Sequence, residues 1–89
     1  MMEIKDYKKL DNQTIIFIFV DGTMRTFCIN RMFMDDIPKN QQYRWKKMFD
    51  NGLFFSNLYI SQGEPVWKGW VELIDDEIIK YTEPYKKGA

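Results

Sequence analysis

The chain of 89 residues contains no histidine and a single cysteine, Cys28. Without histidine, the Ser–His and Cys–His pairs that activate nucleophiles are impossible, and histidine acid–base chemistry and ordinary zinc sites are excluded with them. One cysteine rules out an internal disulfide, and with no signal peptide visible this predicts a reducing, cytoplasmic location. A glycine-rich phosphate-binding loop is also lacking. We therefore expect a protein that is not an enzyme and holds no cofactor.

The chain also has no excess of charge of either sign, because 13 lysines and arginines balance 13 aspartates and glutamates. Binding to DNA or RNA draws on a positive excess that displaces counterions, so nucleic acid is a disfavoured partner, and a polybasic membrane anchor is not expected. The longest apolar run, IIFIFV at residues 15–20, is far shorter than the roughly 20 residues of a membrane-spanning helix. A neutral chain is prone to self-association, so a homodimer is one expected assembly.

Aromatic residues, in contrast, make up 17% of the chain, and hydrophobic residues make up 45%. This composition is typical of a folded domain, and the length corresponds to one small domain. Aromatic side chains build an efficient core and also supply binding surfaces. We expect a single domain over residues 1–89, with a frayed tail at residues 84–89.

The strongest local signal is Asp21-Gly22 between two strand-like segments, residues 13–20 and 23–29. Asp-Gly between strands favours a two-residue type I′ turn, in which both central residues have positive φ. Such a turn pairs Ile15 with Cys28. Because side chains alternate along a strand, Cys28 then joins Ile15 on the apolar face as a small buried hydrophobe. The hairpin also forbids a purely parallel sheet and favours an α+β fold with two or three short helices.

Acidic clusters stand where helices are expected to begin, at Asp35-Asp36 and at Asp75-Asp76-Glu77. Carboxylates at a helix start cap free N–H groups and meet the positive end of the helix dipole. We therefore expect one helix over residues 38–50 and a second one capped by Asp75 and ended by Pro84. Clustered carboxylates also bind Mg²⁺ or Ca²⁺ or carry out acid–base chemistry, so a metal binder or small enzyme stays as an alternative.

Basic and aromatic residues alternate in the first of these helices, where Arg44, Lys46 and Lys47 follow or flank Tyr43 and Trp45. Such a pattern is similar to a surface that binds nucleic acid. With zero net charge, the preferred interpretation is the solvated face of an amphipathic helix with Trp45 in the core. Nucleic-acid binding through Arg44, Lys46 and Lys47 is kept as the alternative hypothesis.

The last predicted strand, EPVWKGW at residues 64–70, carries Trp67 and Trp70 around Gly69. Pro65 has no N–H for a ladder bond, which predicts an edge strand or a strand that begins after it. Tryptophans three residues apart face opposite sides of a regular strand, so one points away from the core unless Gly69 bends the chain. Tryptophan is enriched at binding hot spots, which indicates a partner-binding surface here. The predicted partner-binding residues are Trp70, Trp67, Glu72, Asp75 and Asp76.

The order of these segments resembles the domain of unknown function 2442 family of bacteria, from about residue 4 to residue 81. The motifs that carry the similarity are FVDG at 19–22, RTFCI at 25–29, WKKMFD at 45–50, LFFSNLYIS at 53–61, VWKGWVEL at 66–73 and DDEII at 75–79. The chain departs from the family pattern at Glu72, where Asp is more common, and in a longer loop around Pro38.

The resemblance implies a small α+β domain with a curled antiparallel sheet, built here on the Asp-Gly hairpin, and it implies no catalytic residue. It places Trp67 inside, so Trp70 is expected to be at least partly exposed. Members of the family occur alone, in gene pairs like toxin–antitoxin modules, or joined to helix-turn-helix domains. We therefore expect a non-enzymatic cytoplasmic regulatory module that binds a protein partner or itself, in a toxin–antitoxin-like or mobile-element gene pair. A nucleic-acid-associated transcriptional regulator is the alternative.

Overall fold

The computed structural model describes residues 3–86, which form two antiparallel sheets and four helices. The first sheet has the order β1 (Ile4–Asp11), β2 (Thr14–Phe19), β3 (Met24–Cys28) and β7 (Thr82–Pro84). The second has the order β4 (Leu58–Ser61), β5 (Glu64–Trp67) and β6 (Val71–Glu72). The predicted α+β class is confirmed, although the strands divide into two sheets where one was expected.

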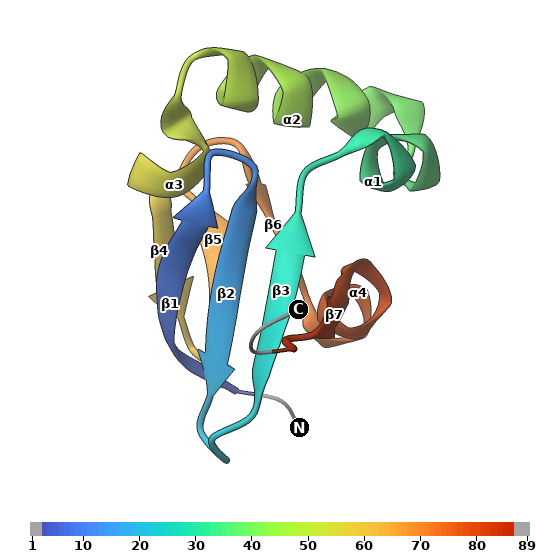
Figure 1. Cartoon of the computed structure of the whole chain (residues 1–89). Helices are drawn as coiled ribbons and strands as arrows, with labels where there is room; N and C mark the ends of the chain where they lie inside the picture. The colour runs from blue at the N-terminus through green and yellow to red at the C-terminus, as the bar shows by residue number, and fades with distance from the viewer. Residues whose placement is uncertain (1–2, 87–89) are drawn as a thin grey trace.

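The helices are α1 (Arg31–Asp36), α2 (Lys39–Asp50), α3 (Leu53–Ser56) and α4 (Asp75–Tyr81). Figure 1 shows α2 lying across one end of the strands, with the first sheet in front of the second. Helix α3 is a single helical turn over residues 53–56. Asn57 N donates to the Leu53 carbonyl at 3.0 Å in this turn, and β4 begins only after it.

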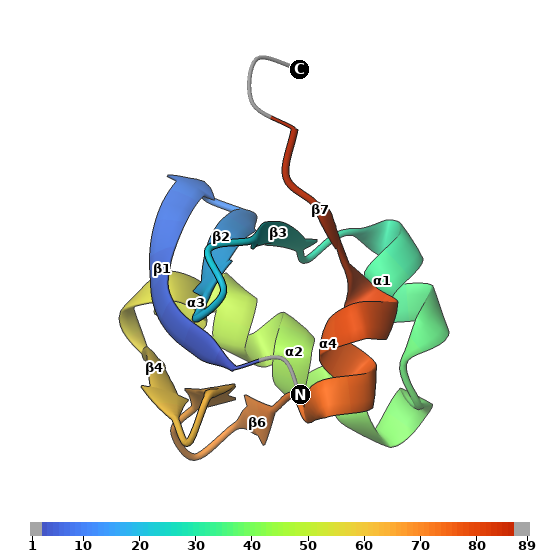
Figure 2. The same ribbon diagram turned by 90° about the horizontal axis from the view of Figure 1, so that it is seen from below.

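The two sheets meet along β1 and β4, which gives the molecule a curled cross-section (Figure 2). The N–H of Ile4 donates to the carbonyl of Gly63 at 2.9 Å. The hydroxyl of Tyr7 donates to the carbonyl of Leu58 at 2.8 Å, and its ring lies edge-on to Phe55. These contacts join the two sheets at a seam without a continuous ladder of backbone hydrogen bonds.

The turn between β2 and β3 is longer by one residue than the predicted two-residue turn. Only Gly22 has positive φ, at 91°, whereas a type I′ turn requires it at Asp21 as well. Gly22 N donates to the Phe19 carbonyl at 2.9 Å, and Phe19 N donates to the Thr23 carbonyl at 2.8 Å. This is the pattern of a type I turn followed by a glycine bulge, the usual three-residue hairpin loop.

The longer turn shifts the register of β3 against β2, so Ile15 lies opposite Phe27 instead of Cys28. A shift by one residue moves every side chain of a strand to the other face. Phe27 is therefore fully buried in the core, and Cys28 is half-buried on the outer face. The predicted place of Cys28 on the apolar face is wrong for this reason.

Two positive φ angles occur instead at Gln62-Gly63, with values of 53° and 81°. This turn joins β4 to β5 and leaves Ser61 opposite Glu64. It is a two-residue hairpin connection of the kind expected at Asp21-Gly22.

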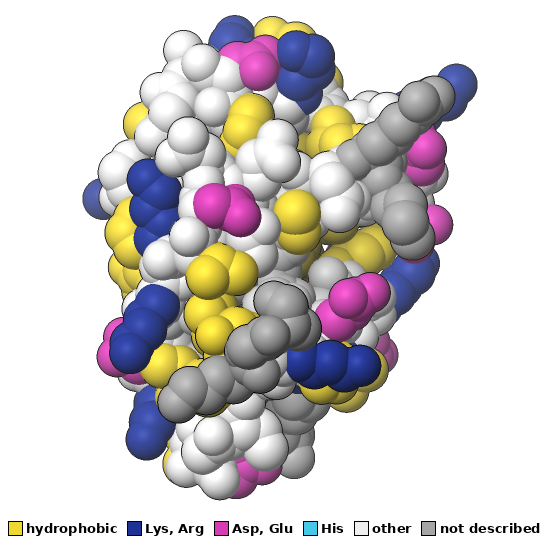
Figure 3. All heavy atoms as spheres, viewed as in Figure 1, with side chains coloured by type: hydrophobic (Ala, Val, Ile, Leu, Met, Phe, Trp, Pro, Cys, Tyr) yellow, Lys and Arg dark blue, Asp and Glu magenta, His cyan; other side chains and the backbone are white. Residues whose placement is uncertain are grey.

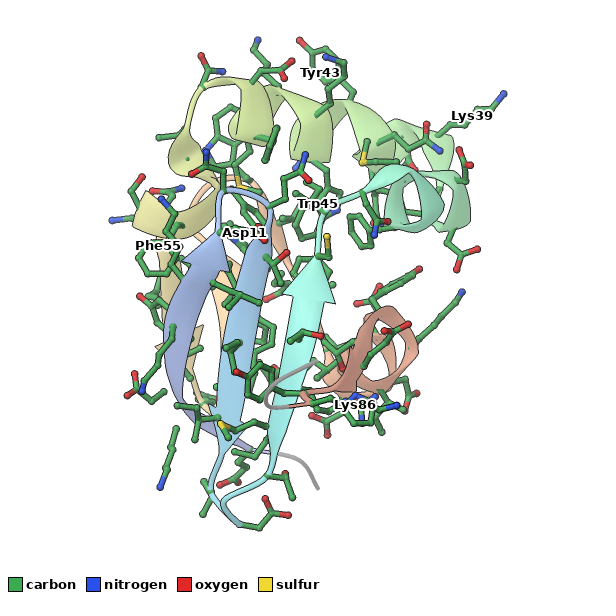
Figure 4. The ribbon with its side chains drawn as sticks, in the orientation of Figure 1. Asp11, Lys39, Tyr43, Trp45, Phe55 and Lys86 are labelled. Atoms are coloured by element: carbon green, nitrogen blue, oxygen red, sulfur yellow. The ribbon has the colours of Figure 1, made fainter. Side chains whose placement is uncertain are left out.

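The core lies between the two sheets and beneath α2, with Phe27 near its centre. The ring of Phe27 has its centroid 4.9 to 5.9 Å from those of Phe33, Trp45, Phe54 and Trp67. Figure 4 shows Trp45 pointing from α2 toward the strands. Its complete burial confirms the amphipathic interpretation of this helix.

Asp35-Asp36 was predicted to cap the start of α2, but it lies at the end of α1 and does not cap α2. Asn30, a favoured N-cap residue, starts α1 by accepting a hydrogen bond of 2.9 Å from Phe33 N. The two aspartates therefore fall in the last turn of α1. Helix α2 starts after Pro38 without a side-chain cap, and Asn51 follows its last residue. The predicted helix over residues 38–50 is confirmed to within one residue.

Pro65 lies in β5, the central strand of the second sheet, and the prediction of an edge strand is wrong. Its carbonyl accepts a hydrogen bond of 3.2 Å from Leu73 N, so its nitrogen faces the same side, at the end of the short ladder to β6. No donor is required at that point, which explains why a proline is tolerated.

Residues 82–86 belong to the ordered fold, which corrects the expectation of a frayed tail for the described part of 84–89. β7 pairs with β3, and Tyr85 N donates to the Met24 carbonyl at 3.0 Å. Residues 87–89 lie outside the described residues. Over residues 3–86, the structure has no helix that is long and apolar enough to cross a membrane.

Candidate functional site

A groove of about 540 Å³ separates the first half of α2 from the segment that runs from β6 into α4. Its size is that of ordinary ligand sites, about 300–1,000 Å³. Figure 2 shows β6 at the border of the second sheet, beside α4. We call this feature the α2–β6 groove. Its lining residues are Asn40, Gln41, Arg44, Trp70, Val71, Glu72, Ile74 and Glu77.

Trp70 enters the groove because the chain turns sharply at Gly69. Gly69 has a φ of 80°, and Trp70 N donates to the Trp67 carbonyl at 2.9 Å, which closes a β-turn directly after β5. Trp67 stays on the core side and is 0% exposed, whereas Trp70 is half-buried. The chain thus bends at Gly69, and the predicted placement of the two tryptophans is confirmed. Complete burial removes Trp67 from the surface that a partner can touch.

The three cations of α2 that were predicted to act together, Arg44, Lys46 and Lys47, do not form one group. Arg44 lines the groove, and its Nη1 donates to the Trp70 carbonyl at 3.4 Å. Lys46 forms an exposed ion pair of 2.6 Å with Asp50. Lys47 Nζ donates to the Tyr43 hydroxyl at 3.1 Å. Of the three cations, Arg44 therefore belongs to the groove, whereas Lys46 and Lys47 contact other residues of α2.

The acidic residues near the groove also have separate places. Glu72 is exposed in β6 and lines the groove. Asp75 and Asp76 are the first two residues of α4, where carboxylates favour the positive end of the helix dipole. Asp75 is not the N-cap as predicted, because Ile74 holds that position. Glu77 Oε1 accepts a hydrogen bond of 3.2 Å from Ile74 N, which is one half of a capping box.

Sequence reasoning missed several residues of the groove wall, namely Asn40, Gln41, Val71, Ile74 and Glu77. Only Ile74 carried a signal. It stands directly before an acidic helix start, where Ser, Thr, Asp or Asn is preferred, and it is 50% exposed. An isoleucine at an N-cap position, whose side chain supplies no cap hydrogen bond and stays outside the core, indicates a surface with an apolar role.

The surface features outside the groove include a small hollow and an apolar sheet face. A hollow of about 160 Å³ between β3, α1 and α4 is lined in part by Cys28 and Lys80. The outward face of the first sheet carries apolar side chains (Figure 3). In this sheet Ile18 pairs with Met24, which is 40% exposed. Neither feature combines a tryptophan with charged residues as the groove does.

The carboxyls with displaced pKa values are in turns. Hydrogen bonds from the hydroxyl and the N–H of Thr23 hold the pKa of Asp21 below its usual value. Hydrogen bonding by the N–H of Gln13 has the same effect on the pKa of Asp11. Both shifts belong to local turn structure. Within residues 3–86, no three Cys, Asp or Glu side chains gather as metal ligands would.

Comparisons of this chain with protein-family models, with curated proteins and with solved structures give no match. The similarity to the domain of unknown function 2442 family therefore stays a prediction from the order of motifs. Any proposal for function rests on the geometry of the groove.

Proposed function

We propose that this protein is a non-enzymatic regulatory module that binds a protein partner in the α2–β6 groove. The observation that carries the proposal is the meeting of Arg44 and Trp70 in one groove, joined by a hydrogen bond from the guanidinium to the Trp70 carbonyl. Arginine and tryptophan are among the residues most enriched at binding hot spots. Here they come from elements that are distant in the sequence and meet at an accessible surface.

The composition of the groove supports a protein partner. Its apolar part consists of Trp70, Val71 and Ile74, and its other wall carries the amides of Asn40 and Gln41. Interfaces combine an apolar centre containing aromatic residues with a polar rim in the same way. A half-buried tryptophan is also accessible without unfolding of the core.

The motif order suggests the setting of this binding. A bacterial, cytoplasmic protein of a toxin–antitoxin-like or mobile-element gene pair would bind the product of the neighbouring gene. A second copy of the same chain is the other protein partner that we consider. Sedimentation of the isolated protein distinguishes the two, because only self-association changes its mass in the absence of other proteins.

Nucleic-acid binding has weaker support. Lys46 is already paired with Asp50, so the face of α2 offers less free positive charge than its sequence indicated. A transcriptional role through Arg44, Lys46 and Lys47 predicts DNA or RNA affinity that falls as salt rises. The metal-binding or small-enzyme alternative predicts a change in melting temperature on addition of Mg²⁺ or Ca²⁺.

Affinity capture from the native host tests the proposal when three variants are compared. Trp70→Ala should lose the partner, and Tyr43→Ala should keep it, because Tyr43 is 66% exposed and points away from the strands (Figure 4). Phe17→Ala serves as the reference for unfolding, since Phe17 is 0% exposed. The proposal fails if Trp70→Ala retains the partner, or if it unfolds the protein as severely as Phe17→Ala does.

A further inference from the structure

The outer edge of β6 is open at one residue, Glu72. Leu73 N donates to the Pro65 carbonyl, which fixes which residues of β6 bond to β5. Successive residues of an antiparallel strand direct their backbone groups to opposite sides. The N–H and C=O of Glu72 therefore point away from β5 and into the α2–β6 groove. Outside the ladder to β5, neither group has a backbone hydrogen-bond partner among residues 3–86.

The same edge is occupied on both sides of Glu72. Two residues earlier, the guanidinium of Arg44 donates to the Trp70 carbonyl. Two residues later, the carboxylate of Glu77 accepts from Ile74 N. Folded proteins commonly cover strand edges with charged side chains to prevent pairing with other chains. Here Arg44 covers the edge at Trp70 and Glu77 covers it at Ile74. The backbone of Glu72 between them is uncovered.

We propose that an extended segment of the partner adds to β6 as an antiparallel strand, with a basic residue at the Ile74 end and an acidic residue at the Trp70 end. This inference rests on the proposed function and specifies the partner's chemistry. Strand addition gains affinity from main-chain hydrogen bonds and specificity from the flanking side chains. The uncovered N–H and C=O of Glu72 supply the main-chain hydrogen bonds. The charges of Arg44 and Glu77 on either side supply the specificity.

The direction of the added strand follows from two observations. All strand pairs of the described structure are antiparallel, and antiparallel pairing is slightly more stable per residue than parallel pairing. Glu72 and Glu77 attract a lysine or arginine at one end of the edge, and Arg44 attracts a carboxylate at the other. An antiparallel segment therefore has its basic residue first and its acidic residue last.

Three capped five-residue peptides test this proposal. The forward peptide has lysine first, glutamate last, and valine, threonine and valine between them. The reversed peptide has the same composition in the opposite order, and the third replaces the central threonine of the forward peptide by proline. Titration into ¹⁵N-labelled protein should shift the amide of Glu72 and the indole N–H of Trp70. We expect the reversed peptide to bind about threefold to tenfold more weakly, the effect of two exposed ion pairs, and the proline peptide not to bind.

Two variants test the role of the charges. Glu77→Gln removes one charge but keeps an oxygen that accepts from Ile74 N, so the start of α4 is preserved. Arg44→Gln removes the opposite charge. Each substitution should reduce the preference for the forward peptide, and the double variant should bind forward and reversed peptides equally.

Several outcomes would overturn the proposal. Equal binding of the forward and proline peptides would mean attraction by charge without strand pairing. Equal binding of the forward and reversed peptides would refute the direction, and an unchanged Glu72 amide would refute the site. If the host partner is captured in a Trp70-dependent manner while all three peptides fail, strand addition is wrong and the proposed function stands. If the forward peptide binds at Glu72 but capture of the host partner does not depend on Trp70, the proposed function is wrong and strand addition at β6 stands.

Discussion

The indole nitrogen of Trp67 donates a hydrogen bond of 2.6 Å to the backbone carbonyl of Phe54, and the two rings stack with centroids 6.0 Å apart. This contact fastens the short helix α3 to β5. It also fixes the start of the next turn, because the Trp67 carbonyl accepts from Trp70 N. One buried tryptophan thus determines where the other one enters the groove.

Trp67→Phe should lower the free energy of unfolding by about 2–4 kcal/mol. The change leaves the buried Phe54 carbonyl without its donor and leaves unfilled volume in the core. Urea unfolding followed by circular dichroism measures the effect. Trp70→Phe is the matched control and should cost less than about 1.5 kcal/mol, because Trp70 is only half-buried. Equal losses for the two variants would contradict the role assigned to the hydrogen bond.

Gly63→Ala should destabilise the protein more than Gly69→Ala, by about 1 kcal/mol or more. Both glycines have nearly the same φ, 81° and 80°, so alanine suffers similar backbone strain at each. A Cβ at Gly63 would lie 3.0 Å from Glu3 Cβ and 3.2 Å from its Cα, whereas nothing lies within 4 Å at Gly69. Thermal unfolding of the two variants gives the comparison. Equal melting temperatures would show that Glu3 does not approach Gly63 this closely.

Arg25→Met should cost about 2 kcal/mol of stability, as expected for lost hydrogen bonds from a charged donor. The Arg25 guanidinium donates to the hydroxyl of Thr82 at 2.6 Å and to its carbonyl at 2.8 Å, so it holds the junction of α4 and β7. Arg25→Lys should restore only part of the loss, because an ammonium lacks the forked geometry. Hydrogen exchange of the Thr82 and Glu83 amides reports on the junction. Wild-type protection in Arg25→Met would refute this interpretation.

Acid should remove a stabilising contribution of Asp21. Its pKa in the folded protein lies below the ordinary value of 3.8 because Thr23 donates to the carboxylate. A lowered pKa means that the contribution is complete above the ordinary value and disappears as the pH falls through the folded pKa. The urea midpoint of wild type should therefore decrease more between pH 5 and pH 2.5 than that of Asp21→Asn. The same decrease in both proteins would contradict the linkage.

Local patterns predicted the extent of α2 and the bend after β5. The three- and four-residue spacing of Trp45, Met48 and Phe49 placed α2 correctly, and Asn51-Gly52 marked its end. The bend at Gly69 could also be predicted, because glycine readily adopts the positive φ of a tight turn. These features depend on residues close together in the sequence.

Other features depend on competition between local preferences and the core. Asp21-Gly22 is compatible with a two-residue turn and with a type I turn plus bulge. Burial of Phe27 among aromatic rings from α1, α2, α3 and β5 favours the second, and no residue near the turn carries that information. The groove was hidden for the same reason, since Arg44 and Trp70 are 26 positions apart and meet only through the packing of α2.

The pairing of β3 with β7 brings together Thr26 and Glu83, which are 57 positions apart. Since a nascent chain leaves the ribosome from its N-terminus, β1, β2 and β3 emerge long before residues 82–84. Hairpins form from local contacts within microseconds, whereas this last strand requires the closure of a long loop. The free edge of β3 therefore stays exposed during synthesis of the middle of the chain. In that interval it is open to pairing with the same strand of another nascent chain, so slow translation of residues 30–81 would favour aggregation.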